Sequence, residues 1–159
     1  MEFISPVPMP GPDVVAPEVY RTIYPMPMFT IVPTDDLEAS KDFWIRGLGF
    51  IDLFSVPGQV THLRRWAFQD VLLVPGETPD KAPGLAVSFS CVLSQIDEIA
   101  EACEALTPAR TIGPEVKLWN SLELTVLTPE NTRVVMTAAR VHDEASRENL
   151  RAIGIDVPD

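Results

Sequence analysis

The order of strand-forming, helix-forming and turn-forming segments in this 159-residue chain occurs twice. Residues 28–75 indicate a strand, a helix and three short strands, and residues 85–139 indicate the same order again. A half-buried strand alternates apolar and polar residues, whereas an amphipathic helix carries an apolar stripe. Two units of this kind can bury their apolar surfaces against each other. The repeat therefore predicts an α+β fold, in which tandem βαβββ units form curved mixed sheets around a cleft.

Local signals place the elements of each unit. Residues 34–36 (Thr-Asp-Asp) are typical of a helix start, and Gly47 and Gly49 mark the end of that helix. In the second unit, Ser94 with Asp97 resembles a capping box. The predicted strands cover residues 28–33, 50–54, 60–68, 71–74, 85–92, 111–112, 117–119, 121–127 and 133–137, and a last helix covers 143–153.

Three further segments flank or join the two units. Residues 1–27 contain seven prolines and form an extended arm, which we expect to lie along the domain or a partner subunit. Residues 76–84 are a linker rich in proline and glycine, and residues 140–159 hold the last helix and a tail. Proline cannot donate to a strand ladder, so neither the arm nor the linker is expected to add a strand.

Composition and charge exclude several classes of function. The net charge of −11 argues against binding to nucleic acid, whose phosphates attract basic surfaces, but is compatible with a cationic ligand. No apolar run approaches the roughly 20 residues of a membrane span. The N-terminus does not resemble a secretory signal, so we expect a cytoplasmic protein without a membrane partner. Cys91 and Cys103 are not spaced as a redox pair and are predicted to be buried thiols.

Two sequence motifs carry a resemblance to a known family. The run from residue 35 to residue 50 is similar to the first helix of the vicinal oxygen chelate superfamily, which includes glyoxalase I, extradiol dioxygenases and bleomycin-resistance proteins. The matching residues are Asp36, Leu37, Ser40, Phe43, Trp44, Leu48, Gly49 and Phe50. Residues 127–137 resemble the family's closing hairpin but depart at Thr128 and Asn131, where Asp and Gly are usual. The resemblance covers about residues 28–139 and implies the glyoxalase/bleomycin-resistance fold.

The resemblance also implies where a metal would be held in this family. Those positions fall near Phe29, Leu72, Val87 or Ser88, and Val135. Of these side chains only a serine hydroxyl has a donor atom, and it is a poor lone ligand for a divalent cation. We therefore expect no metal and no cofactor. The similarity points to the bleomycin-resistance-like branch, whose members form dimers and bind an antibiotic without changing it chemically.

Polar and aromatic residues on the predicted strands are the candidate ligand contacts. Strand alternation places one set on one face of residues 60–68 and another set on residues 119–125. The candidates are His62, Arg64, Trp66, Phe68, Ser88, Trp119, Ser121 and Glu123. Such residues suit a pocket that stacks a planar ligand and fixes it with a few polar groups, although an outward-facing sheet surface would also explain them. Glu123 could pair with a cationic amine, or act as a base together with His62.

Three hypotheses for the function follow. The first is a non-catalytic protein that binds and sequesters a small aromatic natural product, with or without a positive charge, as a homodimer. The second is a metal-free isomerase, cyclase or lyase of secondary metabolism that uses Glu123 or His62 as acid or base. A metalloenzyme with ligands at other positions is a third. The sequence favours the first, and it leaves open whether the cleft closes within one chain or across two.

Overall fold

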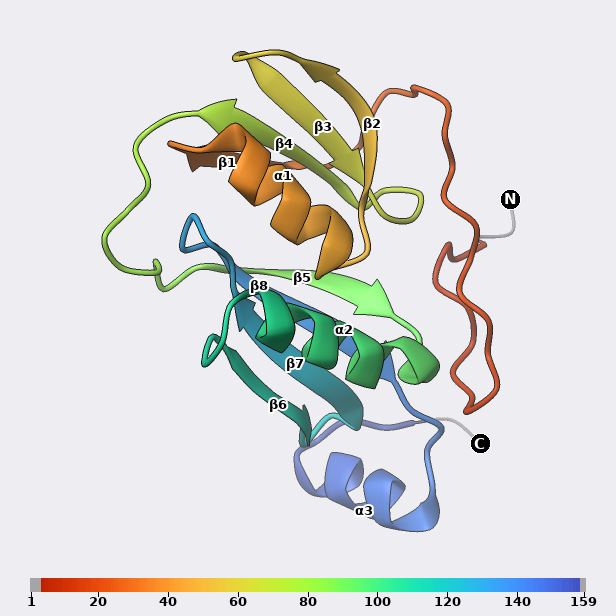
Figure 1. Ribbon diagram of the computed structural model, residues 1–159. Coiled ribbons are helices and arrows are strands. Elements are labelled where there is room, and N and C mark those ends of the chain that lie inside the picture. Colours follow the sequence, from red (N-terminus) through yellow and green to blue (C-terminus); the bar gives the residue numbers. More distant parts are fainter. Residues whose placement is uncertain (1–3, 158–159) are drawn as a thin grey trace.

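Two four-stranded mixed sheets form the body of the protein, and both helices of the repeat lie on the same side of them (Figure 1). This computed structural model describes residues 4–157; the first three residues of the predicted arm and the last two of the predicted tail lie outside this range. The first unit contains β1 (Thr30–Thr34), α1 (Leu37–Arg46), β2 (Ile51–Val56), β3 (Val60–Arg64) and β4 (Asp70–Pro75). The second contains β5 (Ala86–Cys91), α2 (Leu93–Leu106), β6 (Thr111–Val116), β7 (Ser121–Leu127) and β8 (Arg133–Ala139), and α3 (Glu144–Ala152) follows.

The two sheets have the same topology. Their strand orders are β1-β4-β3-β2 and β5-β8-β7-β6. β1 is parallel to β4 and β5 is parallel to β8, and the other neighbouring strands are antiparallel. Ile31 is paired with Leu72 in the first sheet, as Ser88 is with Val135 in the second. A long connection through a helix is what a parallel pair requires, and each unit supplies one. The predicted α+β fold of tandem βαβββ units is confirmed.

The start and end of α1 follow from its sequence. The Asp36 carboxylate accepts a hydrogen bond from the backbone N–H of Ala39 at 2.9 Å, as an N-cap should. After the helix, Gly49 adopts φ +78°, a conformation that glycine reaches without steric cost, and the chain turns there into β2. The buried face of α1 carries Phe43 and Trp44.

The start of α2 differs from the prediction. The helix begins at Leu93, because Val92 is still extended, so Ser94 already lies within the first turn. The backbone N–H of Val92 donates to Gln95 Oε1 at 3.3 Å. The predicted capping box of Ser94 and Asp97 is therefore wrong.

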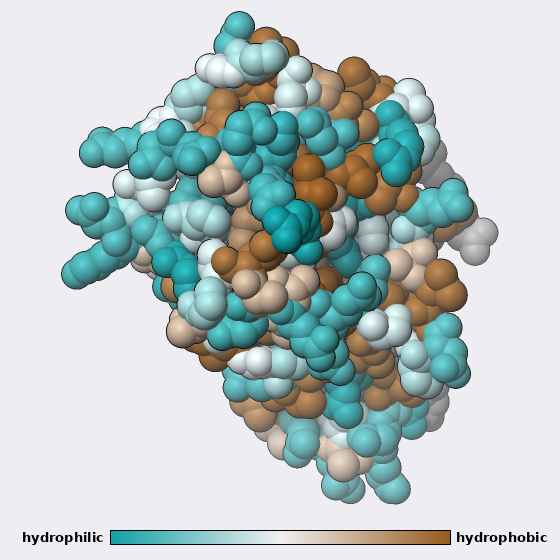
Figure 2. Space-filling model, in the orientation of Figure 1, coloured by the Kyte–Doolittle hydropathy of each residue, from teal (hydrophilic) through white to brown (hydrophobic). Residues whose placement is uncertain are grey.

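One hydrophobic core joins the two units. Trp44 and Phe50 of the first unit meet Phe89 of the second edge to face, with Phe50 and Phe89 ring centroids 5.2 Å apart. Cys91 and Cys103 are buried in the same core as free thiols, as predicted. The helix-bearing side that covers this core is largely hydrophilic outside, with hydrophobic patches toward the side of the arm (Figure 2).

The largest differences from the predicted strands lie at β3 and β6. β3 stops at Arg64 because residues 65–69 form a tight turn, in which the Arg65 N–H donates to the Gln69 carbonyl at 3.1 Å. Phe68 in that turn has φ +68°. β6 is one strand over Thr111–Val116 with a bulge, so Trp119 lies in the turn before β7 and not on a strand.

The closing turn explains the two departures from the family motif. Asn131 adopts φ +60°, and asparagine is one of the few residues besides glycine that tolerate this region. The Thr128 hydroxyl accepts a hydrogen bond from the backbone N–H of Thr132 at 3.0 Å, which is a task an aspartate side chain also performs in turns. The turn therefore forms without the usual Asp and Gly.

The arm has neither helix nor strand over residues 4–27, and part of it runs along the domain. At the other end, Asp143 caps α3 by accepting from the Ser146 N–H at 2.8 Å, and Leu150 is buried. None of the helices within residues 4–157 has the length and apolarity needed to cross a bilayer.

Candidate functional site

Each sheet has one face against the helices and one face without them, which we call the first and second open faces. In the first sheet, Leu63, Val71 and Leu73 belong to the core. Because side chains alternate along a strand, the intervening residues of β3 and β4 point to the first open face. In the second sheet the same alternation places Ser88 of β5, Glu123 of β7 and Thr137 of β8 on the second open face.

A buried polar cluster occupies part of the first open face. Asp70 accepts hydrogen bonds from three side chains: His62 Nε2 at 2.8 Å, Arg64 Nε at 2.7 Å and the Tyr24 hydroxyl at 2.8 Å. His62, Arg64 and Asp70 are each at most 3% exposed. A carboxylate beside a guanidinium at this depth is compensated by charge as well as by hydrogen bonds.

The N-terminal arm covers this cluster. Arg64 Nη1 donates to the backbone carbonyls of Tyr20 and Thr22, both at 2.8 Å, and the guanidinium stacks over the Tyr24 ring at 4.2 Å. The Tyr24 hydroxyl also accepts from the Phe68 N–H at 2.6 Å. Burial, together with the neighbouring Asp70, raises the pKa of Tyr24. His62 and Arg64 therefore lie beneath the arm, where they hold it to the sheet.

The predicted shared face of His62, Arg64, Trp66 and Phe68 is wrong for the last two residues. β3 ends at Arg64, and strand alternation ends with it. The directions of the Trp66 and Phe68 side chains are therefore set by the turn that follows. Trp66 is buried and packs against the Arg65 guanidinium at 4.9 Å, whereas Phe68 is half exposed. The predicted pair of His62 with Glu123 does not form within the chain either, because His62 is bound to Asp70.

The second open face gathers four predicted residues. Glu123 Oε1 accepts from Trp119 Nε1 at 2.8 Å and from Ser121 Oγ at 2.7 Å. Thr137, which is paired with Glu123 across β7 and β8, shares a 2.7 Å hydrogen bond with Ser88. The result is a polar strip that crosses three strands, from the Trp119 turn to Ser88. Within residues 4–157, Glu123 Oε2 has no hydrogen-bonding partner.

A cavity of about 180 Å³ lies where the two sheets meet, at the Ser88 end of this strip. Its walls come from the start of β1, the turn after β3, and β5, and the arm closes one side. The lining includes Phe29, Trp66, Phe68, Asp70, Ser88 and Ser90. Three of the predicted contacts (Trp66, Phe68 and Ser88) therefore share one cavity, and the polar strip continues from it over the second open face.

The positions at which the family resemblance implies a metal do not fit a divalent cation. Their open-face residues are Ile31 and Leu72 in the first sheet and Ser88 and Val135 in the second, and Phe29 immediately precedes β1. Divalent cations in proteins are held by imidazole, carboxylate or thiolate groups, and these positions carry none. Across residues 4–157, no three His, Cys, Asp or Glu side chains are grouped closely enough to hold a metal ion.

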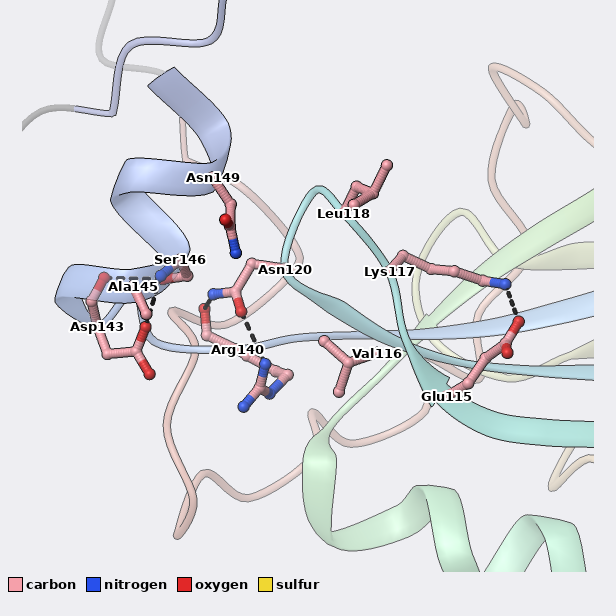
Figure 3. Close-up of a pocket in the computed structure, with 10 residues that line it drawn as sticks. All are labelled: Glu115, Val116, Lys117, Leu118, Asn120, Arg140, Asp143, Ala145, Ser146 and Asn149. Carbon is pink, nitrogen blue, oxygen red and sulfur yellow. Dashed lines mark hydrogen bonds and ion pairs between the residues drawn. The ribbon is translucent and has the colours of Figure 1, made fainter. Parts of the chain in front are cut away.

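A cavity of about 450 Å³ was not foreseen from the sequence (Figure 3). It lies between the end of β6, the following turn and α3. Its polar side chains bind one another: Arg140 Nη1 donates to Asn120 Oδ1 at 2.8 Å, Asp143 caps Ser146, and Lys117 forms an ion pair with Glu115. The Arg140 bond joins the segment between β8 and α3 to the turn before β7, whereas the other two contacts are local.

Sequence reasoning missed Tyr24, Asp70 and Thr137. The strand predicted over residues 71–74 begins one residue earlier, and with that residue included, alternation would have placed Asp70 on the same face as Leu72. Thr137 lies on a strand that was predicted. No local signal could have revealed Tyr24, because its partner Asp70 is 46 residues away.

Comparison with known proteins identifies the fold. No protein-family model and no curated protein sequence matches the chain. Among solved structures, the fosfomycin resistance protein FosX from Listeria monocytogenes, complexed with Mn(II) and sulfate, has a TM-score of 0.62 at 13% identity, covering 83% of this chain and 99% of that one. An integron cassette protein from the Halifax Harbour sewage outfall has a TM-score of 0.56 at 22% identity, covering 73% and 99%. The chain has the glyoxalase/bleomycin-resistance fold of these structures.

Lactoylglutathione lyase from Agrobacterium tumefaciens is a further structure with this fold, at a TM-score of 0.51 and 19% identity, covering 70% of this chain and 91% of that one. The resemblance stated from the two motifs is thus confirmed at the level of the fold. One scaffold can host many activities, so the function must be argued from the residues of this chain.

Proposed function

We propose that this protein binds and sequesters a small aromatic compound, with or without a positive charge, and that it does so without a metal ion. The ligand site comprises the second open face and the adjoining cavity of about 180 Å³. The observation that carries this proposal is the arrangement of Glu123, whose one oxygen is held by Trp119 and Ser121 while the other receives no hydrogen bond from any residue between 4 and 157.

The two donors fix the Glu123 carboxylate in one orientation. A held acidic group beside an indole ring suits a ligand that combines a flat apolar body with a cationic or hydrogen-bond-donating end. Trp119 is 54% exposed and Phe68 is 50% exposed, so each offers a ring surface at one end of the polar strip. The net charge of −11 would draw a cation toward such a site.

The donor set supports the metal-free part of the proposal. Ile31, Leu72 and Val135 offer no ligand atom, and Ser88 already shares its hydroxyl hydrogen bond with Thr137. A lone serine hydroxyl binds divalent cations poorly. The fosfomycin resistance protein complexed with Mn(II) has the same fold. In this chain the four side chains named above lack the chemistry of a metal site.

We also propose that the protein acts as a homodimer. Large apolar residues are exposed on both open faces, among them Ile31 at 59% and Phe54 at 40% on the first and Ile112 at 61% on the second. Pairing these faces under twofold symmetry would bury them and would enclose the polar strip.

A metal-free isomerase, cyclase or lyase is the second candidate. The same unoccupied oxygen of Glu123 that would pair with a cation could accept a proton from a bound substrate. His62 is a weaker candidate for this role, because it is 3% exposed, is bound to Asp70 and lies beneath the arm.

Native mass spectrometry on the protein as purified, with metal analysis of the same sample, tests the main proposal. We expect a metal-free dimer that carries or accepts an intact aromatic compound. A panel of aromatic amines then identifies binders by quenching of tryptophan fluorescence, and Glu123→Gln should weaken cationic members more than neutral ones. Stoichiometric metal would contradict the proposal. Chemical turnover that Glu123→Gln abolishes without loss of affinity would support the enzyme instead.

A further inference from the structure

Arg65 lies between the two units on the helix side, away from the open faces. It is 3% exposed, and its hydrogen bonds cross the junction: Nη1 donates to the Ser90 carbonyl at 2.7 Å, and Nη2 donates to Gln95 Oε1 at 2.6 Å. A third bond joins Nη1 to Gln69 Oε1 at 3.3 Å. Trp66 covers one face of the guanidinium.

This buried cation has no acidic partner. Every hydrogen-bond acceptor of Arg65 is a neutral carbonyl or amide oxygen, and within residues 4–157 no carboxylate lies within ion-pair distance of it. Burial lowers the pKa of the Arg65 guanidinium, which reflects the cost of keeping this charge away from water. A buried charge is usually paired, and here 23 acidic residues were available to the chain.

One side of the guanidinium remains available. Of its five N–H groups, the three bonds above use two on Nη1 and one on Nη2, so the Nε–H and one Nη2 N–H have no partner within residues 4–157. Nε and Nη2 form one side of the planar fork, the side that can hold a carboxylate through two parallel bonds. Gly49 lies next to it, and a Cβ at that position would be 3.7 Å from Nε.

A cavity of about 190 Å³ opens at this place, with Arg65 in its wall. One water needs only about 10–15 Å³ measured in this way, so the cavity has room for a small organic ion. Two turns of helix and the loop after α1 line it, with Arg46, Gly47, Gly49, Gln95, Glu98, Ile99 and Ala102 as the other residues. In Figure 1 this corresponds to the region where the last turn of α1 approaches α2.

The geometry points to a binding site for a small carboxylate ion at this cavity, in which Arg65 grips the ligand through Nε and Nη2 and Arg46 contacts it from the rim. Arg46 is itself paired with Asp42 at 2.8 Å, and Glu98 adds a negative charge to the same wall. The two arginines and the two carboxylates together carry no net charge, and Arg65 is the one cation among them without an ion-pair partner within residues 4–157. This balance favours a singly charged carboxylate over a doubly charged phosphate.

The arginine side-chain Nε–H signals of the ¹⁵N-labelled full-length protein report binding directly. Sodium acetate is titrated at constant ionic strength, with sodium chloride as the replacement salt. We expect one Nε–H signal to shift with saturation, and we expect that signal to be missing in Arg65→Lys. Glu98→Gln should tighten acetate binding several-fold because a like charge is removed, whereas Arg46→Gln should weaken it.

Glu101→Gln is the matched control, since Glu101 is exposed on the same helix but does not line the cavity. It should leave acetate affinity unchanged. If Arg65→Lys fails to fold, the opposite effects of Glu98→Gln and Arg46→Gln still decide the matter. A linear response to acetate, an equal response to chloride, or equal behaviour of the Glu98 and Glu101 variants would overturn the carboxylate site. Tighter binding of inorganic phosphate than of acetate would overturn the assigned ligand class.

Discussion

The indole N–H of Trp44 donates to Glu130 Oε1 at 2.7 Å and so joins α1 of the first unit to the β7–β8 turn of the second. The other carboxylate oxygen accepts from Ser40 Oγ at 2.8 Å, and Ser40 in turn is bound to Thr34. Glu130 is 2% exposed and Trp44 is fully buried. Buried polar groups are costly when they are left unpaired, so this cluster links the folding of the two units.

Removing Glu130 should therefore destabilise the whole chain. Glu130→Ala leaves two buried donors without an acceptor and should lower the free energy of unfolding by about 2–4 kcal/mol. Trp44→Phe should cost about 1–3 kcal/mol, and the double variant should cost clearly less than the sum. Urea unfolding followed by circular dichroism measures all three. Glu38→Ala on the exposed face of α1 is the control, with an effect within about 0.5 kcal/mol. Strict additivity would contradict the linkage.

The residues of this cluster also show what the sequence could predict. Ser40 and Trp44 stood in the recognised helix motif, and Glu130 stood in the closing turn, so each element was predicted from local signals. Their meeting was not predicted, because 86 residues separate Trp44 from Glu130 and no periodic pattern relates such distant positions. The same distinction holds across the molecule. β7 was predicted with its observed bounds because apolar and polar residues alternate through it.

The candidate site was less predictable than the fold for two physical reasons. Trp66 and Phe68 continued the alternation of β3, but the turn over residues 65–69 redirected their side chains. His62 and Arg64 do lie on the first open face, yet the arm covers them through backbone carbonyls that any sequence would provide. Ser88, Ser121 and Glu123 were placed on one face from strand parity alone, which needs no long-range information.

Loss of the Tyr24 hydroxyl should loosen the arm. Tyr24→Phe removes the bond to Asp70 and the bond from the Phe68 N–H, while the ring and its contact with Arg64 can remain. Local opening exposes backbone to proteases. Arg21 is exposed and lies in the part of the arm that covers the polar cluster, so it supplies a trypsin site there. We expect cleavage after Arg21 to accelerate about tenfold, in line with the ~1.4 kcal/mol that one or two lost hydrogen bonds contribute. Tyr20→Phe is the matched control, because within residues 4–157 the Tyr20 hydroxyl makes no hydrogen bond; an equal acceleration in both variants would contradict the role of Tyr24.

The buried thiols should make stability fall at alkaline pH. Burial raises the pKa of Cys91 to about 11 and that of Cys103 to about 12, from an ordinary value near 9. Between pH 9 and 11 the unfolded chain therefore releases protons that the folded chain retains. The unfolded state binds fewer protons, so the free energy of unfolding decreases with rising pH, by up to about 1.4 kcal/mol per pH unit for each thiol.

Urea unfolding at pH 8, 9, 10 and 11 measures this slope. Cys91→Ala with Cys103→Ala should lower stability at pH 8, because two core side chains become smaller, but should flatten the decline above pH 9. The difference in slope isolates the thiols from lysines and tyrosines that titrate in the same range. In the wild-type protein at pH 8, both thiols should react with a disulfide reagent only as fast as the chain unfolds. Parallel pH curves for the two proteins would contradict this assignment.

A charge on the first open face should separate the proposed dimer. Ile31 lies on β1, an edge strand of the first sheet, and is 59% exposed in the single chain. Ile31→Asp adds a charge where a partner's apolar surface would have to cover it, and burying an unpaired carboxylate costs several kcal/mol. We expect light scattering coupled to size-exclusion chromatography to change from dimer to monomer, with the circular dichroism spectrum unchanged. Ile153→Asp is the control, since Ile153 is 51% exposed at the end of α3, away from both sheets, and should leave the dimer intact. A wild-type monomer, or a dimer unaffected by Ile31→Asp, would mean that the open faces are not the interface and that each chain forms its ligand site alone.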